Sequence, residues 1–421
     1  MPRQRRINAG LLGLGKVGKE LLLQYSNQNH SFNINFVADS KHVLSKRGGE
    51  AFAKSELRRI VAIKNEGPLA SQENYQNAIK RCRFDEFDTL EQELSIILDL
   101  TSSSILNWVM FDTSQLSAEA DCEIVRKLLG CLAYCTGNKA PWADYHLCSD
   151  LYKEAKRRRT QLGINCTNGV WADQMEALPI VALSLKEGRV EVRKRDNSSF
   201  NSFFAKLGKG LDPGRAISEI AAAGHLEKSD ANSLSAEVKD QTYKACISAN
   251  ICGILRGKKP ILSPEIRSGP LTGPKSLSPS DIATWHLEGR ERGRYPALIG
   301  RISMNDQELL CKIGFEELTK EDTLSRDFPA KCAFSVSPCP DARFLWSSTT
   351  AKSGVRGYAN SGYGGAVRSA AKLLWEVERA ISLSQEARLE SDFSPLPILL
   401  ALYAGRSDAE FLQMRLARSL F

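Results

Sequence analysis

The sequence predicts an α/β protein, in which a doubly wound parallel sheet is followed by a second, α+β domain. Two observations predict this class. Strand-like and helix-like segments alternate over residues 1 to about 150, and patterns of antiparallel strands follow beyond about residue 160. The chain has 421 residues, which exceeds the usual size of one domain, so we expect two domains and an extension.

The first strand-to-helix junction carries three spaced glycines. The stretch "INAGLLGLGKVGKELL" starts at residue 7 and places Gly13, Gly15 and Gly18 around Lys16 and Val17. In a dinucleotide-binding turn the first glycine permits the turn, the second admits the pyrophosphate, and the third allows the helix to pack closely. A ligand-free turn between a strand and a helix is the alternative.

The second strand-like run, "INFVADSKH", ends in an acid. Asp39 follows Gly18 by 21 positions and precedes Ser40. An acid at this distance holds ribose hydroxyls in NAD enzymes, whereas a helix cap or a turn is the alternative role. The two features together predict a Rossmann-type domain.

Further strands and helices complete the alternation. The run "LSIILDLTSSS" predicts a third buried strand whose polar end includes Thr101 and Ser102, close to a bound nicotinamide. The run "GCLAYCTGNKAPW" predicts another strand that turns at Thr136 to Lys139, and "DYHLCSDLYKEAKRRR" predicts a long amphipathic helix.

The second domain starts with a strand in "GRVEVRKR" and helices in "PGRAISEIAAAGH" and "VKDQTYKACISANICGIL". We expect residues 256–285, rich in Pro, Gly, Ser and Lys, to be largely loop. Four antiparallel strands follow from "ALIGRISM" to "RFLWSSTT". A glycine-rich turn then precedes a strong helix, and the tail adds one or two amphipathic helices.

The charge of the chain argues against a nucleic-acid partner. The net charge is +8, from 57 Lys and Arg against 49 Asp and Glu. The basic runs near residue 3, at 156–159 and at 193–195 are scattered, so we interpret them as solvated faces.

The cysteine content and the hydropathy of the chain indicate the cellular compartment of the protein. The 11 cysteines include no C-x-x-C pair, so neither disulfides nor a metal site is expected, and reduced thiols favour a cytoplasmic protein. Cys131 and Cys135 are expected to be a reduced, buried pair. We expect no membrane span and no signal peptide.

Several motifs resemble one family when taken in order. "GLGKVG", "VADS", "LDLTSSS", "TGNKAP", "AGHLE" followed by "VKDQTYKA", and "SGYGGAVRSAAKLL" resemble homoserine dehydrogenase over residues 7–380. The compact form of that family is the one resembled, without a fused aspartate kinase or a C-terminal regulatory domain.

The resemblance implies an NAD(P)-dependent interconversion of L-homoserine and L-aspartate 4-semialdehyde, a step of threonine and methionine biosynthesis. It implies NADP or NAD as cofactor, a small amino-acid substrate, and a homodimer formed through the second domain. The implied domain limits are 1–160 with 345–380 for the discontinuous dinucleotide-binding domain, 161–344 for the substrate-binding and dimerisation domain, and 381–421 for a helical extension.

The resemblance also assigns roles to residues. The implied cofactor-binding residues are Gly13, Gly15, Lys16, Val17, Gly18, Asp39, Ser40, Thr101, Ser102, Gly362 and Gly364. The implied substrate-binding residues are Ser198, Ser199 and Glu227, the last for the substrate ammonium group. The implied catalytic residues are Lys139, Asp240 and Lys244.

The chemistry of the lysines agrees with such a role. Hydride transfer to an aldehyde builds negative charge on its oxygen, so an acid must donate a proton there. A lysine can do this if burial or a neighbouring cation lowers its pKa. Asp240 lies four positions before Lys244, on the same helix face, and could orient it. A plain surface salt bridge is the alternative for this pair.

Departures from the family pattern concern the substrate. Asn165 stands near the place of the acid that precedes the family's glycine loop, which puts a monovalent-cation site in doubt. Trp171 in that loop and Phe200 after the two serines favour a larger or less polar amino-aldehyde. The alternatives are therefore a related dehydrogenase for another amino or hydroxy acid, or a non-catalytic NAD(P)-binding sensor.

Overall fold

The computed structural model describes residues 7–39, 42–46, 50–66, 79–83, 108–114, 117–168, 190–195, 197–223, 226, 233–262, 273–305, 307–325, 333–339, 342–347 and 365–386. These residues form two compact units. Unit 1 takes its described residues from Met1–Pro141, His146–Thr167 and Ser369–Phe421, and unit 2 takes its own from Trp142–Tyr145 and Asn168–Arg368.

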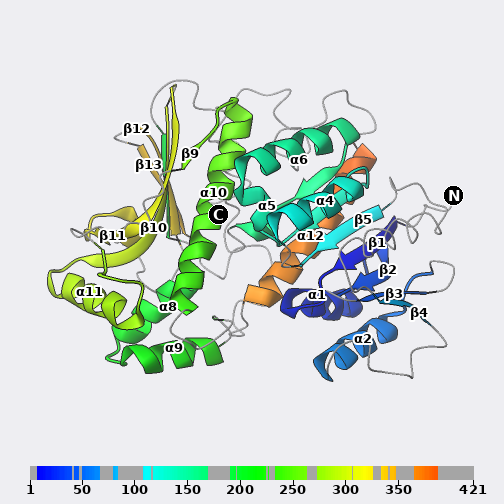
Figure 1. Cartoon of the computed structure of the whole chain (residues 1–421), viewed down its shortest axis with the longest axis horizontal. Coiled ribbons are helices and arrows are strands. Elements are labelled where there is room, and N and C mark those ends of the chain that lie inside the picture. The colour runs from blue at the N-terminus through cyan, green and yellow to red at the C-terminus, as the bar shows by residue number, and fades with distance from the viewer. Residues whose placement is uncertain are drawn as a thin grey trace. The chain divides into compact units, whose positions relative to one another are not determined.

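Unit 1 is a sheet with helices, and within its described residues the sheet has seven strands. These strands are β1 (Ile7–Leu12), β2 (Phe32–Ala38), β3 (His42–Lys46), β4 (Ile79–Arg83), β5 (Trp108–Asp112), β6 (Ala133–Thr136) and β7 (Gln161–Gly163). The helices are α1 (Lys16–Asn27), α2 (Lys54–Glu66), α4 (Ala118–Leu128), α6 (Tyr145–Arg158) and α12 (Gly365–Glu386), as labelled in Figure 1.

The strand order of unit 1 is β4-β3-β2-β1-β5-β6-β7, and the five strands from β2 to β7 in this order are parallel. Strands β3 and β4 extend the edge in antiparallel fashion. The chain therefore leaves β1 toward β2 and later returns to pair β5 on the other side of β1. Ligands of doubly wound sheets bind at such a switch point, beyond the carboxyl ends of the strands.

Helix α12 belongs to the core of unit 1 although it comes more than 200 residues after β7. Its apolar residues Leu373 and Val377 are fully buried and join one cluster with Leu11 of β1, Val109 of β5 and Ala133 of β6. The predicted Rossmann-type fold is confirmed, including a second unit that contains both helices and strands.

Unit 2 contains a second sheet, with six strands among the described residues. They are β8 (Val190–Arg195), β9 (Ile261–Leu262), β10 (Tyr295–Met304), β11 (Leu309–Leu318), β12 (Ala333–Cys339) and β13 (Ala342–Ser347), in the order β13-β12-β8-β10-β11-β9. The helices are α8 (Ser198–Leu207), α9 (Pro213–Ala222), α10 (Ser233–Arg256) and α11 (Pro279–Glu291), and the residues of the short α5 (Ala140–Ala143) are divided between the two units. A turn of 3-10 helix, η5 (Asn165–Thr167), follows β7, and another, η6 (Thr323–Ser325), follows β11.

The expectation that residues 256–285 are largely loop is wrong at its end, because α11 begins at Pro279. Ser278 caps this helix, since its hydroxyl accepts a hydrogen bond from the Asp281 amide at 3.1 Å. A serine followed by proline at the first helical position is a regular helix start. The Ser and Pro residues here therefore indicated the capped start of a helix and not a loop.

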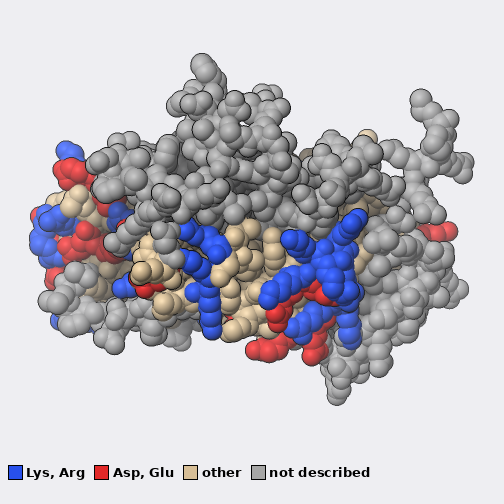
Figure 2. Space-filling model, turned by 90° about the horizontal axis from the view of Figure 1, so that it is seen from above, with Lys and Arg blue, Asp and Glu red and all other residues tan. Residues whose placement is uncertain are grey.

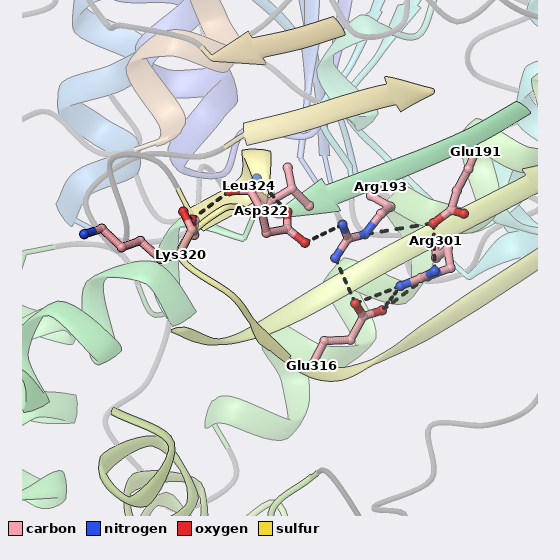
Figure 3. A network of polar contacts seen from close by, with 8 residues as sticks. Glu191, Arg193, Arg301, Glu316, Lys320, Asp322 and Leu324 are labelled. Atoms are coloured by element: carbon pink, nitrogen blue, oxygen red, sulfur yellow. Dashed lines mark hydrogen bonds and ion pairs between the residues drawn. The ribbon is translucent and has the colours of Figure 1, made fainter. Parts of the chain in front are cut away.

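The two faces of the sheet in unit 2 differ. A Cβ at Gly300 of β10 would lie 3.1 Å from Cβ of Ala245, so this side of the strand faces α10. The next residue, Arg301, points to the opposite face, because successive side chains of a strand alternate. On that face Arg301 pairs with Glu191 at 2.7 Å (Figure 3).

Arg193 of β8 extends this ion-pair network. Its guanidinium lies 2.7 Å from Asp322 and 3.1 Å from Glu316, and Glu316 also binds Arg301 (Figure 3). Lys194 and Arg195 are fully buried. The interpretation of the basic run 193–195 as a solvated face is therefore wrong, because strand alternation and burial hold these cations inside unit 2.

The basic run at the end of α6 agrees with the sequence prediction. Arg157 and Arg158 are exposed and both contact the carboxylate of Glu154 one turn earlier. Figure 2 likewise shows blue Lys and Arg atoms lying beside red acidic atoms on the face seen from above. Among the helices within the described ranges, none is long and apolar enough to cross a membrane.

Candidate functional site

The glycine turn joins β1 to α1 at the switch point of unit 1. Gly13 has a positive φ of 87°, and its amide donates to the Ala38 carbonyl at 2.9 Å. A Cβ at Gly18 would lie 2.1 Å from the Gly13 carbonyl oxygen, whereas a Cβ at Gly15 would meet nothing within 4 Å among the described residues. Gly13 and Gly18 are thus required by the fold, and the space at Gly15 is left open.

Helix α1 begins at this open space. Its N-cap is Gly15, which has no side chain that could cap the helix. The first amides of a helix point away from its body and carry partial positive charge, so an uncapped N-terminus attracts an anion. This arrangement can hold a phosphate through Gly15, Lys16 and Val17.

Two residues after β5 complete the turn. The Thr113 hydroxyl donates to the carbonyl oxygens of Leu12, at 3.2 Å, and of Gly13. The hydroxyl oxygen of Ser114 is buried and has no hydrogen-bond partner among the residues described. A buried hydroxyl that lacks a partner fits a ligand group, because an unmade hydrogen bond costs about 1–3 kcal/mol.

Sequence reasoning missed Thr113 and Ser114. It placed the third strand at "LSIILDLTSSS" and assigned Thr101 and Ser102 to the nicotinamide side, and both of these residues lie outside the described residues. The strand that pairs with β1 is Trp108–Asp112. Its four buried apolar residues, followed by Asp-Thr-Ser, carried the same signal of an apolar run with a polar end.

Asp112 organises the carboxyl edge of the sheet. It is fully buried at the end of β5 and accepts hydrogen bonds from the Tyr134 hydroxyl at 2.7 Å and the Thr136 hydroxyl at 2.9 Å. The Thr136 hydroxyl in turn accepts from the amide of Asn138 at 2.9 Å. The turn that carries Lys139 is therefore fastened to the strand beside the glycine turn.

Asp39 lies at the end of β2, as predicted, and is buried there. Its carboxylate is 2.5 Å from the ammonium group of Lys64 on α2. The sequence did not show this partner, which stands 25 positions later. The ion pair offsets the negative charge that would otherwise repel a phosphate at this strand end.

The predicted pair on α10 is formed. The ammonium group of Lys244 lies 2.6 Å from the Asp240 carboxylate, and 14% of the lysine side chain and 28% of the aspartate side chain are exposed. A pair buried to this degree is more shielded from water than a plain surface salt bridge.

A buried polar cluster of Asn168, Lys194 and Ser248 lies against the backbone of Lys244. The Asn168 amide donates to the Lys244 carbonyl at 2.8 Å, and the Lys194 ammonium donates to the Asn168 amide oxygen at 2.6 Å and to the Ser248 hydroxyl at 3.0 Å. The turn of α10 that carries Lys244 is thereby fixed.

A third ionisable group joins this face of α10. Glu237 precedes Asp240 by three positions and accepts a hydrogen bond from the Asn197 side chain at 3.0 Å. Burial raises the pKa of Glu237, and the like charge of Asp240 adds to this rise. Hydrogen bonds from Asn197 and Ser199 and the charge of Lys244 oppose it. Sequence reasoning missed Glu237, although its helical spacing from Asp240 and Lys244 was visible.

Helix α8 brings the predicted serines to this cluster. Asn197 caps the helix by accepting from the Phe200 amide at 2.8 Å. Ser198 begins α8, and Ser199 is buried and hydrogen-bonds Glu237. Ser199, Asp240 and Lys244 thus all act on the carboxylate of Glu237 within unit 2.

Phe200 does not face a substrate. It is 1% exposed, and its ring packs 5.7 Å from Phe204 and 5.8 Å from Phe315 in the core of unit 2. The expectation that Phe200 makes the pocket less polar is therefore wrong, because the helical register turns this ring into the core. Trp171 lies outside the described residues, as do the predicted site residues Ser40, Glu227, Gly362 and Gly364.

The buried cysteines agree with the expectation of reduced thiols. Cys131 and Cys135 are both free and buried, and burial raises the pKa of Cys131 to about 12. Neither thiol is reactive in this state, since the thiolate is the reactive form.

No protein-family model matches the chain, and no curated protein matches it. Solved structures do match. A hyperthermophilic archaeal homoserine dehydrogenase in complex with NADPH is 17% identical, with a TM-score of 0.59 over 90% of this chain and 98% of that chain. The homoserine dehydrogenase from Thermoplasma acidophilum is 15% identical, with a TM-score of 0.60 over 90% of this chain and 100% of that chain.

A protein of unknown function from Candida auris matches as well. It is 14% identical, with a TM-score of 0.61 over 90% of this chain and 99% of that chain. At these identities the matches show a shared fold, which spans both units.

Proposed function

We propose that the chain is an NAD(P)-dependent dehydrogenase that interconverts L-homoserine and L-aspartate 4-semialdehyde. The observation that carries the proposal is the uncapped N-terminus of α1 at the switch point, where Gly15 leaves open space. The order of the motifs supports the substrate, and the archaeal enzyme of the same fold was solved with NADPH.

The residues of unit 1 fit the cofactor. In the proposal Gly15, Lys16 and Val17 hold the pyrophosphate through backbone amides, and Ser114 supplies its partnerless hydroxyl to the same ligand. We retain the untested assignments of Ser40, Thr101, Ser102, Gly362 and Gly364 to cofactor binding. The bound nicotinamide supplies or accepts the hydride.

The proposed enzyme binds both NADPH and NADH. Asp39 alone would bind ribose hydroxyls and repel the additional phosphate of NADP. Because Lys64 holds the Asp39 carboxylate at 2.5 Å, a cation is present where that phosphate would approach. We therefore expect NADPH binding in addition to NADH binding.

The residues of unit 2 fit proton transfer to and from the substrate oxygen. When the aldehyde is reduced, the developing alkoxide takes a proton, for which we propose Lys244, with Lys139 of unit 1 as the second lysine. Asp240 orients Lys244 through their 2.6 Å ion pair. In the reverse direction the same lysine removes the hydroxyl proton. Ser198, Ser199 and Glu227 bind the amino-acid part of the substrate in this proposal.

We further propose that the protein works as a cytoplasmic homodimer, with the domain limits expected from the sequence. Sedimentation of the purified chain tests the dimer.

One experiment separates the proposed function from its alternatives. NADPH and NADH are titrated by fluorescence, and NAD(P)H oxidation is then followed with L-aspartate 4-semialdehyde and a panel of other amino-aldehydes. Turnover of the semialdehyde is expected. Turnover of another aldehyde alone identifies a related dehydrogenase, and cofactor binding without any turnover identifies a sensor. Failure to bind either cofactor contradicts the proposal as a whole.

A further inference from the structure

Two cysteines of unit 2 lie at the contact between α10 and β11. Gly253 of α10 packs on β11, because a Cβ placed on it would lie 3.2 Å from Cδ2 of Leu309. Cys246 precedes Gly253 by two helical turns and shares this side of the helix. Cys311 follows Leu309 by two positions, so it lies on the same face of the strand. The two thiols therefore meet between the helix and the strand.

The two thiols form a hydrogen-bonded pair. Both are free cysteines. The Cys311 thiol donates to the sulfur of Cys246, which lowers the pKa of Cys246, and the charge of Lys194 adds to this lowering while burial opposes it. The same hydrogen bond, together with burial, raises the pKa of Cys311. Cys246 is therefore the thiol that ionises first, with Cys311 as its hydrogen-bond donor.

The surroundings of Cys246 suit a reactive thiol. Reactive cysteines lie beside cations and keep some access to solvent. The buried cation is Lys194, whose ammonium group donates to the Ser248 hydroxyl, two residues after Cys246, at 3.0 Å. Cys246 is 6% exposed and Cys311 is 0% exposed, so a small oxidant meets Cys246 first. Cys252 of the same helix differs, because burial raises its pKa to about 12.

We propose that Cys246 and Cys311 are a redox switch, in which a peroxide converts the two thiols into a disulfide between α10 and β11. The Cys246 thiolate attacks hydrogen peroxide, the O–O bond breaks, and Cys246 becomes a sulfenic acid while one water leaves. The sulfur of Cys311 then attacks the sulfur of Cys246, the S–O bond breaks, and the hydroxyl group leaves with a proton as a second water. Two thiols are thus oxidised by two electrons, and one peroxide is reduced to two waters.

The disulfide would form two residues after Lys244. Its sulfur atoms lie about 2.05 Å apart, which is closer than a hydrogen-bonded pair, so α10 must move toward β11 at this turn. Turnover should therefore fall while the disulfide is present and recover when a thiol reductant opens it by exchange. This consequence rests on the proposed function of Lys244, whereas formation of the disulfide does not.

The test maps the disulfide in the full chain. The purified protein is treated with hydrogen peroxide, its remaining thiols are alkylated, and cross-linked peptides are identified by mass spectrometry with and without dithiothreitol. The variants are Cys246→Ser and Cys311→Ser. Cys252→Ser is the matched control, because Cys252 is a buried cysteine of the same helix. Circular dichroism shows whether each variant folds, and the mapping of the wild type requires no variant.

We expect a reversible cross-link between Cys246 and Cys311 in the wild type and in Cys252→Ser. Cys311→Ser should stop at the sulfenic acid of Cys246, which dimedone traps, and Cys246→Ser should leave Cys311 as a thiol. In the cross-linked wild type, kcat/KM for L-aspartate 4-semialdehyde should fall about 10- to 100-fold, the cost of a misplaced catalytic group, and should recover with dithiothreitol.

Cys246 and Cys311 that both stay reduced in peroxide overturn the inference, as does a cross-link that joins either of them to Cys252 instead. A complete cross-link with unchanged turnover also overturns the switch. A chain that forms the cross-link but does not turn over the semialdehyde even before oxidation supports the redox pair and contradicts only the proposed function.

Discussion

A Cβ on Gly18 would lie 2.1 Å from the carbonyl oxygen of Gly13. The same added atom would lie 2.8 Å from the Thr113 hydroxyl oxygen. Real Cβ atoms do not approach backbone oxygens so closely, so three segments of the chain, from β1, α1 and β5, meet at this point only because residue 18 has no side chain.

The first prediction follows from this contact. Gly18→Ala should lower the free energy of unfolding by about 1–3 kcal/mol, since the nearest atom is a backbone oxygen of Gly13, which cannot easily move away. Urea unfolding followed by circular dichroism measures it. A variant as stable as the wild type would contradict the close packing at the turn.

A substitution at Gly15 should have the opposite effect to Gly18→Ala, because it should affect cofactor binding and not stability. Gly15→Val should leave the unfolding free energy within about 0.5 kcal/mol, because the added Cβ meets none of the described atoms within 4 Å and the backbone is extended. NADPH affinity should fall about tenfold or more, since valine fills the space proposed for the pyrophosphate. Fluorescence titration measures this affinity, and an unchanged value would leave the glycines as a simple turn.

Lys64 should decide between the two cofactors. Lys64→Met removes the cation that holds Asp39, so the carboxylate should repel the phosphate of NADPH while it still accepts the ribose hydroxyls of NADH. We expect the NADPH dissociation constant to rise about tenfold more than that of NADH. Lys54→Met is the control, because Lys54 lies on the same helix and binds Asn29 instead. Equal changes for both cofactors would exclude this role.

The lysines should affect turnover and not cofactor binding. Lys244→Met and Lys139→Met keep an unbranched, apolar side chain and remove the proton donor, so kcat/KM should fall about 10²- to 10⁴-fold in each. Asp240→Asn should cost less than Lys244→Met if Asp240 only orients the lysine. Steady-state kinetics and NADPH titration of the same variants test this. A fall in kcat/KM of less than a few-fold would mean that Asp240 and Lys244 form only a structural salt bridge.

His286 should make unit 2 sensitive to acid. The ring is buried and stacks 4.4 Å from Phe204, and burial, reinforced by the charge of Arg290, lowers its pKa to about 4. The unfolded chain has a histidine pKa of about 6.5 and binds the proton first, so stability is fully present above pH 6.5. It should fall by about 3 kcal/mol as the pH drops from 6.5 to 4.

Two variants separate the contribution of His286 to acid sensitivity from that of other groups. His286→Phe keeps the aromatic stack and should flatten the decline in unfolding free energy between pH 6.5 and 4, whereas His146→Asn, at an exposed position, should not. The measurement is urea unfolding at a series of pH values. A decline of the same slope in His286→Phe would assign acid sensitivity to other groups.

Much of the site follows from local sequence. The glycines, the acid at the end of β2, and the Asp240–Lys244 spacing are short-range signals, because the strand, the turn and the helix that present them are contiguous. Their positions in the structure agree with the prediction. Their proposed roles in binding and catalysis stay predictions.

The interaction partners of these residues could not be predicted from the sequence. Asp39 meets Lys64 across 25 positions, and Asp112 meets Tyr134 and Thr136 across more than 20. Such pairs form only once neighbouring strands and helices are placed, and no local periodicity encodes them. The predicted strand in "LSIILDLTSSS" lies outside the described residues. Trp108–Asp112 is another apolar run with a polar end within 20 residues of it, and only its pairing with β1 identifies it as the neighbouring strand.

The position of α12 has a consequence for biosynthesis. The seven described strands of unit 1 end by residue 163, yet Leu373 and Val377 of its core leave the ribosome more than 200 residues later. Until then the sheet exposes an apolar face to a crowded cell, while unit 2 is translated and can fold independently of that face. We therefore expect a stage of synthesis at which unit 2 has folded while unit 1 still lacks α12. A chaperone that shields apolar surface would find its substrate at this stage, before translation ends.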